Sequence, residues 1–176
     1  MSIKSAYIHI PFCVRICTYC DFNKYFINKQ PVDEYISALI KEMKTSEIRN
    51  LETMYVGGGT PTALNLKQLE TLLKAIQSTF SIKGEYTFEA NPDELTLDKV
   101  KLLHSYGVNR ISMGVQTFKP ELLKILGRTH KTQDIYNAVD YARKANIESI
   151  SLDLMYHLPT QTLDDFSDSL NRAIQM

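Results

Sequence analysis

The sequence has little glycine, proline or cysteine and no excess of either charge. Seven glycines and six prolines among 176 residues exclude a collagenous or low-complexity chain. Hydrophobic residues make up 44% and charged residues 23%, which excludes a disordered chain. Lys+Arg and Asp+Glu both total 20, so the basic excess of a general nucleic-acid binder is missing. These features predict one globular α/β domain with no nucleic-acid partner.

Long apolar runs are also missing. No run approaches the roughly 18 residues of a membrane span, so we expect no transmembrane segment. The apolar patch at 6–12 is short and is interrupted by His9, unlike a signal peptide. A cytoplasmic location is therefore expected.

The cysteines are few but clustered. There are three, Cys13, Cys17 and Cys20, and all lie within eight residues. A disulfide framework uses an even number of cysteines in an oxidising compartment, whereas this number is odd and no export signal is present. The cluster therefore points to metal or redox chemistry.

The rest of the chain predicts alternating strands and helices. Short apolar, β-branched or aromatic runs predict strands at Ala6–Ile10, Thr53–Val56, Tyr86–Ala90, Arg110–Val115 and Ser149–Met155. Amphipathic spacing and capping residues predict helices at 32–43, 66–76, 96–106, 120–127, from 132, and at 162–174. Five such units fit a parallel sheet, whereas a full eight-unit barrel usually needs about 250 residues. The last helix reaches the end of the chain uncapped, so we expect a C-terminally truncated partial (β/α) barrel.

Polar or glycine-rich segments follow each predicted strand. The cysteine loop follows the first strand and Gly57–Thr60 the second. Glu89, Gln116 and Asp153 lie at or near the ends of the other three. Because the C-terminal ends of parallel strands form one rim, where active sites lie, these segments predict one site. The glycines and the carboxylates also have simpler interpretations. The glycines would form a tight turn, and the carboxylates would pair with Arg110 or Arg128.

The spacing Cys-x3-Cys-x2-Cys is the most specific signal. Three thiolates can hold three irons of a [4Fe–4S] cluster, which normally takes four cysteines, so one iron keeps an open position. One alternative is a zinc site with His9 or His104 as fourth ligand, although structural zinc usually uses two ligand couples and no second couple is present. The other alternative is a set of buried, inert thiols.

These motifs resemble the radical S-adenosylmethionine (SAM) superfamily and, within it, the oxygen-independent coproporphyrinogen III oxidase family. The resemblance covers about residues 6–165. It rests on the cysteine loop with the flanking strings Tyr7–Phe12 and Asp21–Phe22, and on Gly57–Thr62, Glu89–Pro92, Arg110–Phe118, Gly127–His130 and Asp153–Tyr156.

The resemblance implies a partial (β/α)6 barrel, of which residues 1–176 form an incomplete radical SAM core domain that lacks the family's C-terminal region. It implies that the three cysteines hold the cluster. In such proteins the reduced cluster passes an electron to the sulfonium of SAM, and the resulting radical abstracts hydrogen. It also implies that the following residues line the SAM site: Tyr7, Tyr19, Gly58, Gly59, Thr60, Glu89, Gln116, Arg128 and Asp153. Arg128 suits a carboxylate, and the glycine backbone would meet the methionine amino group.

One position separates the branches of the family. Members that decarboxylate coproporphyrinogen carry a further cysteine two residues after the third cluster ligand, where this chain has Phe22. The chain therefore resembles the haem-chaperone branch, which implies haem or porphyrin as cargo, acceptor haem proteins and an electron donor for the cluster. Whether it is also an enzyme stays open, with porphyrinogen oxidation as the alternative. A second departure is His157, where the family has glycine.

Overall fold

The computed structural model describes residues 3–176 and contains a five-stranded sheet. The strands are β1 (Ser5–Ile10), β5 (Thr53–Gly58), β7 (Tyr86–Ala90), β8 (Arg110–Gln116) and β9 (Ser149–Leu154). Their order in the sheet is their order in the chain, and every pairing is parallel. This arrangement is the wall of a (β/α) barrel and confirms the predicted fold class. All five strands were predicted, with ends that differ by at most two residues.

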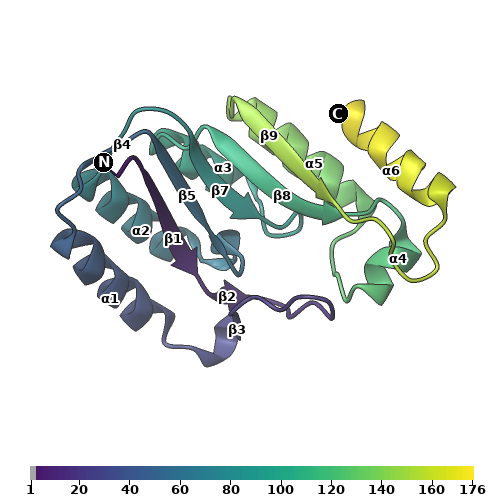
Figure 1. Cartoon of the computed structure of the whole chain (residues 1–176), viewed down its shortest axis with the longest axis horizontal. Helices are drawn as coiled ribbons and strands as arrows, with labels where there is room; N and C mark the ends of the chain where they lie inside the picture. Colours follow the sequence, from purple (N-terminus) through teal and green to yellow (C-terminus); the bar gives the residue numbers. More distant parts are fainter. Residues whose placement is uncertain (1–2) are drawn as a thin grey trace.

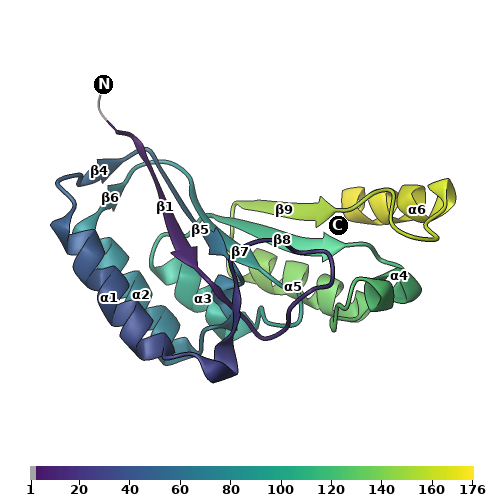
Figure 2. The same cartoon turned by 60° about the horizontal axis from the view of Figure 1, so that its bottom comes forward.

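The helices cover one face of this sheet. They are α1 (Val32–Thr45), α2 (Leu66–Thr79), α3 (Leu97–Ser105), α4 (Pro120–Ile125), α5 (Thr132–Lys144) and α6 (Leu163–Ile174). In Figures 1 and 2, α1, α2, α3 and α5 lie side by side on the same face, while α4 lies beyond the end of β8. Within residues 3–176 the opposite face carries no helix, and the cysteine loop crosses near its rim (Figure 2).

Predicted capping residues set the ends of several helices. Asn65 forms a capping box with Gln68 at the start of α2, and the Thr96 side chain accepts a hydrogen bond from the Lys99 N–H at the start of α3. Gly107 ends α3 with a φ of 87°, in the left-handed region that glycine tolerates. Helix α5 differs slightly, because Lys131 rather than Thr132 is its N-cap.

Two hydrophobic clusters hold the structure together. The main core packs strand residues such as Val56, Phe88 and Ile111 against helix residues such as Leu72 and Leu103, all of them fully buried. The smaller cluster consists of Leu122, Leu126 and Leu158, and Tyr19 of the cysteine loop packs on it. The core thus fixes the sheet, and the smaller cluster supports the loop that carries the thiols.

Several short elements were not predicted. Strand β2 (Phe12–Cys13) pairs with β3 (Tyr25–Phe26), and β4 (Asn50–Leu51) pairs with β6 (Ser81–Ile82). Two-residue strands are too short to show an alternating pattern, so no sequence signal indicates them. The β2–β3 pair closes the base of the cysteine loop. Within residues 3–176, no helix is both long and apolar enough to cross a membrane.

Candidate functional site

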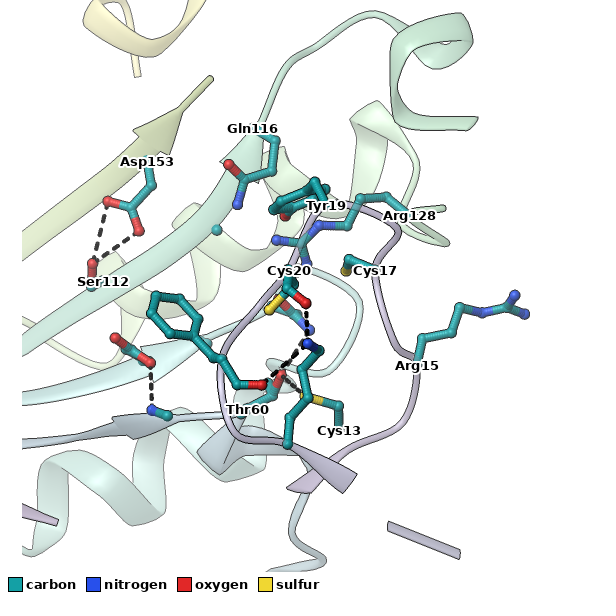
Figure 3. Close-up of a pocket in the computed structure, with 18 residues that line it drawn as sticks. Cys13, Arg15, Cys17, Tyr19, Cys20, Thr60, Ser112, Gln116, Arg128 and Asp153 are labelled. Atoms are coloured by element: carbon teal, nitrogen blue, oxygen red, sulfur yellow. Dashed lines mark hydrogen bonds between the residues drawn. The ribbon is translucent and has the colours of Figure 1, made fainter. Parts of the chain in front are cut away.

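A cavity lies at the C-terminal ends of the strands, and we call it the cofactor cavity. The cysteine loop lines one side of it, and residues from β5, β7, β8 and β9 line the other (Figure 3). It includes every site residue predicted from the sequence except Tyr7: Cys13, Cys17, Tyr19, Cys20, Gly58, Gly59, Thr60, Glu89, Gln116, Arg128 and Asp153. The fold therefore gathers residues that lie up to 140 positions apart in the chain (Cys13 to Asp153).

The three thiols are free and differ in exposure. Cys13 is buried, whereas Cys17 and Cys20 are partly exposed. Burial raises the pKa of the Cys13 thiol, while the Thr60 hydroxyl, 3.6 Å from its sulfur, donates a hydrogen bond that favours the thiolate. Cys13 thus sits at the floor of the cavity, and the other two thiols lie nearer its mouth.

Contacts from a distant part of the chain hold the cysteine loop. The Thr18 N–H donates to the Leu126 carbonyl and the Thr18 hydroxyl to the Ile125 carbonyl, both at 3.3 Å. Within the loop, the Lys24 ammonium donates to the Cys20 carbonyl. These bonds tie the loop to the end of α4 and so fix its path over the rim.

The zinc interpretation has no support among residues 3–176. They contain no group of three or more His, Cys, Asp or Glu side chains positioned around a single ion. His9 is engaged elsewhere, since its Nδ1 lies 3.2 Å from the Tyr7 hydroxyl and its Nε2 3.1 Å from the Asn23 carbonyl. A cubane cluster places its ligands on separate irons, so its thiolates need not converge on one point.

The N–H groups of the glycine segment at the end of β5 are engaged within the protein. The N–H groups of Gly58, Gly59 and Thr60 donate to the Glu89 carboxylate, the Ile10 carbonyl and the Phe12 carbonyl, at 2.9, 2.9 and 2.8 Å. These three N–H groups are therefore not free to bind a phosphate, which argues against a phosphate-binding loop here. A ligand amino group, in contrast, needs acceptors such as backbone carbonyls.

Two carboxylates line the sheet side of the cavity. Glu89 accepts from the Tyr55 hydroxyl at 2.7 Å through Oε1 and from the Gly58 N–H at 2.9 Å through Oε2. Asp153 accepts from the Ser112 hydroxyl at 3.2 Å through Oδ2 (Figure 3). Each carboxylate keeps lone pairs that can accept from hydroxyl or amino groups of a ligand.

A chain of hydrogen bonds joins the cationic end of the cavity to the cysteine floor. Arg128 Nη1 donates to Asn91 Oδ1 at 2.6 Å, Asn91 Nδ2 donates to Thr60 Oγ1 at 3.1 Å, and Thr60 donates to Cys13. Arg128 Nε is buried and has no hydrogen-bond partner among the described residues. An unpaired guanidinium donor of this kind is suited to a ligand carboxylate.

Three positions at the rim have unusual local geometry. A Cβ on Gly114 would lie 2.8 Å from Arg128 Nη2 and 2.9 Å from Gln116 Nε2, so glycine leaves room for both side chains. Gln116 itself has a φ of 67°, at a β-bulge that ends β8. Non-glycine residues in this region are uncommon and gather at functional sites. His157 also adopts a left-handed φ of 61°, the conformation that glycine accepts most easily.

The two predicted tyrosines lie in different places. Tyr19 packs over the cavity beside Arg128, and burial raises the pKa of its hydroxyl to about 12, so it stays protonated (Figure 3). Tyr7 is exposed, stacks on Tyr55 and contacts His9 rather than lining the cavity. Further lining residues that were not singled out from the sequence include Asn91, Ser112 and Gly114. All three lie inside the motifs that carry the family resemblance, which was the available signal.

Glu94, near this site, should make stability depend on pH. Its Oε1 accepts from Asn91 at 3.2 Å, its Oε2 has no partner among the described residues, and burial raises its pKa to about 7. Between about pH 4.5 and 7 the Glu94 carboxyl is therefore protonated in the folded chain but ionised in the unfolded chain, whose pKa is 4.5. Because the unfolded chain alone releases this proton, Glu94 lowers the unfolding free energy increasingly as the pH rises through this range. We expect the unfolding free energy of Glu94→Gln, measured relative to the wild type at the same pH, to increase by about 2 kcal/mol when the pH is raised from 5 to 8.

Urea denaturation of the reduced protein at both pH values measures this difference. The exposed Glu34→Gln on α1 is the matched control and should follow the wild-type pH profile. Parallel profiles for Glu94→Gln and the wild type would show that Glu94 titrates normally.

Comparison with known proteins identifies the family of this site. The model of the radical SAM superfamily matches residues 7–173, nearly the whole chain. The chain therefore belongs to the radical SAM superfamily, as its cysteine spacing predicted. That family implies a [4Fe–4S] cluster and SAM as cofactors.

The individual relatives are haem chaperones and a porphyrinogen oxidase. The heme chaperone HemW of Bacillus subtilis is 50% identical over 99% of this chain and 48% of its own length. HemW of Escherichia coli is 38% identical over 98% of this chain and 47% of its own. The solved structure of E. coli coproporphyrinogen III oxidase (HemN) superposes with a TM-score of 0.89 at 34% identity, over 98% of this chain and 41% of its own. The chain thus spans about half the length of the curated relatives it matches.

The residues of the cofactor cavity fit both implied cofactors. Thiolates are the ligands that iron–sulfur clusters use, and three unpaired thiols line the cavity. Arg128 Nε, which has no partner among the described residues, and the Glu89 and Asp153 carboxylates match the carboxylate, hydroxyl and amino groups of SAM. The donor set therefore agrees with the family assignment.

Proposed function

We propose that this chain holds a [4Fe–4S] cluster on Cys13, Cys17 and Cys20, binds SAM in the cofactor cavity, and is the radical SAM part of a haem chaperone. The observation that carries this proposal is the meeting of three free thiols in one cavity with Arg128, whose Nε has no hydrogen-bond partner among the described residues. Residues 1–176 would form one incomplete core domain, in agreement with the length of its relatives.

In this proposal the chain's own groups orient the cofactors. Arg128 binds the SAM carboxylate, and carbonyls of the glycine segment accept from its amino group. Glu89, Asp153 and Gln116 bind its ribose hydroxyls and amines. Tyr19, protonated and packed beside Arg128, excludes water from the loop side. When bound, the cluster and SAM supply one-electron chemistry that side chains cannot provide.

Haem as cargo is supported by sequence similarity and by Phe22. The matches to heme chaperones reach 50% identity, whereas the match to E. coli oxygen-independent coproporphyrinogen III oxidase is 35%. Phe22 lines the cavity, 73% exposed, and has neither a thiol nor a polar hydrogen for the role of the oxidases' extra cysteine. The partners in this proposal are haem, acceptor haem proteins and an electron donor, in the cytoplasm.

A haem-transfer assay tests this proposal. After anaerobic reconstitution of the cluster, the protein should bind haem, followed by its absorbance, and pass it to an apo-haem protein. Supplied with SAM, a reductant and coproporphyrinogen III, it should form no protoporphyrinogen. Decarboxylation of that substrate with release of carbon dioxide would instead make the protein an oxidase.

A further inference from the structure

A second cavity, which we call the basic cavity, lies on the outer side of the cysteine loop, between this loop and helices α4 and α5. Its volume is about 570 Å³, within the usual range for small-molecule sites. Arg15 and Arg128 line both this cavity and the cofactor cavity, so the two are neighbours. Arg15 extends away from Cys13 and Thr60 (Figure 3).

Four cations and no carboxylate line the basic cavity. The cations are Arg15, Lys124, Arg128 and Lys131. Not one of them forms an ion pair within residues 3–176, although the whole chain carries equal numbers of acidic and basic residues. Two carboxylates of the neighbourhood are engaged outside the cavity, since Asp93 accepts from the Thr129 hydroxyl and Asp134 from the Lys131 N–H. Such a cluster is complementary to an anion.

A buried histidine adds an unsatisfied donor to this cavity. His130 is 3% exposed, and neither ring nitrogen makes a hydrogen bond of normal geometry, although the Val115 carbonyl lies near the ring. A neutral imidazole keeps one N–H, and leaving it unpaired in a buried site is costly. An acceptor oxygen of a ligand would remove this cost.

The walls of the cavity are apolar. Pro120 and the buried Leu123 form part of them, and the lysine side chains contribute their methylene stems. A small inorganic anion would leave this apolar surface unused. A ligand with an apolar body and carboxylates at one edge matches both the walls and the cations, and a tetrapyrrole with propionate groups has this chemistry.

We infer that the basic cavity binds the carboxylate edge of the tetrapyrrole cargo, with Lys124 and Lys131 pairing with its propionates and His130 donating to them. This inference rests on the proposed function. It adds a residue set for the cargo that is separate from the cysteines and from the SAM-binding groups.

Absorbance titrations of the cluster-loaded protein test this inference. They compare haem with haem dimethyl ester, which lacks the negative charges of the two propionates. The wild type should bind haem at least about tenfold more tightly than the ester. The double variant Lys124→Gln, Lys131→Gln should lose about tenfold in haem affinity and bind the ester as before. The matched control Lys41→Gln, Lys101→Gln changes two exposed lysines on α1 and α3 and should bind haem like the wild type.

The outcomes separate this inference from the proposed function. The inference would be overturned if the wild type bound haem and the ester with equal affinity and the double variant bound haem as tightly as the wild type. That result would leave the chaperone proposal intact. If inorganic phosphate competed strongly with haem while haem and the ester bound equally well, the cavity would be assigned to a free anion. That result would also overturn the inference. A protein that loads its cluster but binds neither haem nor the ester would contradict the proposed function, and the inference with it.

Discussion

Replacing Cys17 with alanine should abolish the binding of iron and sulfide. The wild type, reconstituted anaerobically, should hold close to four iron and four sulfide per chain, and Cys17→Ala close to none. The reason is that the chain offers only three thiols, so the loss of one leaves two, too few to hold a cubane. Iron and acid-labile sulfide analysis measures both quantities.

Phe22→Ala is the matched control, because Phe22 belongs to the same loop but has no ligand atom. It should load iron and sulfide like the wild type. Full loading of Cys17→Ala, or stoichiometric zinc without acid-labile sulfide in the wild type, would contradict the assignment of the three thiols.

Replacing Gly59 with alanine should displace the cysteine loop and destabilise the fold. The added Cβ would lie 2.7 Å from the Phe12 carbonyl oxygen, 2.8 Å from the Phe12 nitrogen and 2.9 Å from the Pro11 carbonyl carbon. All three are backbone atoms that cannot rotate away, and they lead directly into Cys13. We expect a loss of about 2–3 kcal/mol in unfolding free energy together with reduced cluster loading.

Gly107→Ala separates this clash from the general effect of removing a glycine. Gly107 has a φ of 87°, but a Cβ there would meet no atom within 4 Å. It should cost only about 1 kcal/mol of left-handed strain and leave cluster loading unchanged. Equal unfolding free energies and equal iron content for the two variants would show that Gly59 plays no special part in placing the loop.

The sequence predicted the sheet and the helices because their signals are local. Strand runs such as Tyr86–Ala90 and capping residues such as Asn65 and Thr96 act within a few residues, so the expected elements appear with small changes at their ends. The residues of the site were predicted by a different argument. Parallel strands place their C-terminal ends on one rim, so residues as far apart as Thr60 and Asp153 meet there.

The remaining features depend on contacts that a linear pattern does not contain. The Thr18 contact with the end of α4 joins segments more than 100 residues apart. The cations of the basic cavity come from the cysteine loop, α4 and the segment before α5, so their grouping is visible only in the fold. His130 illustrates the same point, because its sequence neighbours indicate an ordinary loop residue while tertiary packing buries it.

The most direct test of the central claim, a SAM-binding cluster on this rim, is the EPR spectrum of the reduced, reconstituted protein with and without SAM. Saturating SAM should change the cluster signal, since the three cysteines and the residues proposed to bind SAM line one cavity. Glu89→Ala and Arg128→Ala should weaken that change while retaining iron and sulfide, because these residues bind SAM and not the cluster. A spectrum of the cluster-loaded wild type that stays unchanged at saturating SAM would contradict the account.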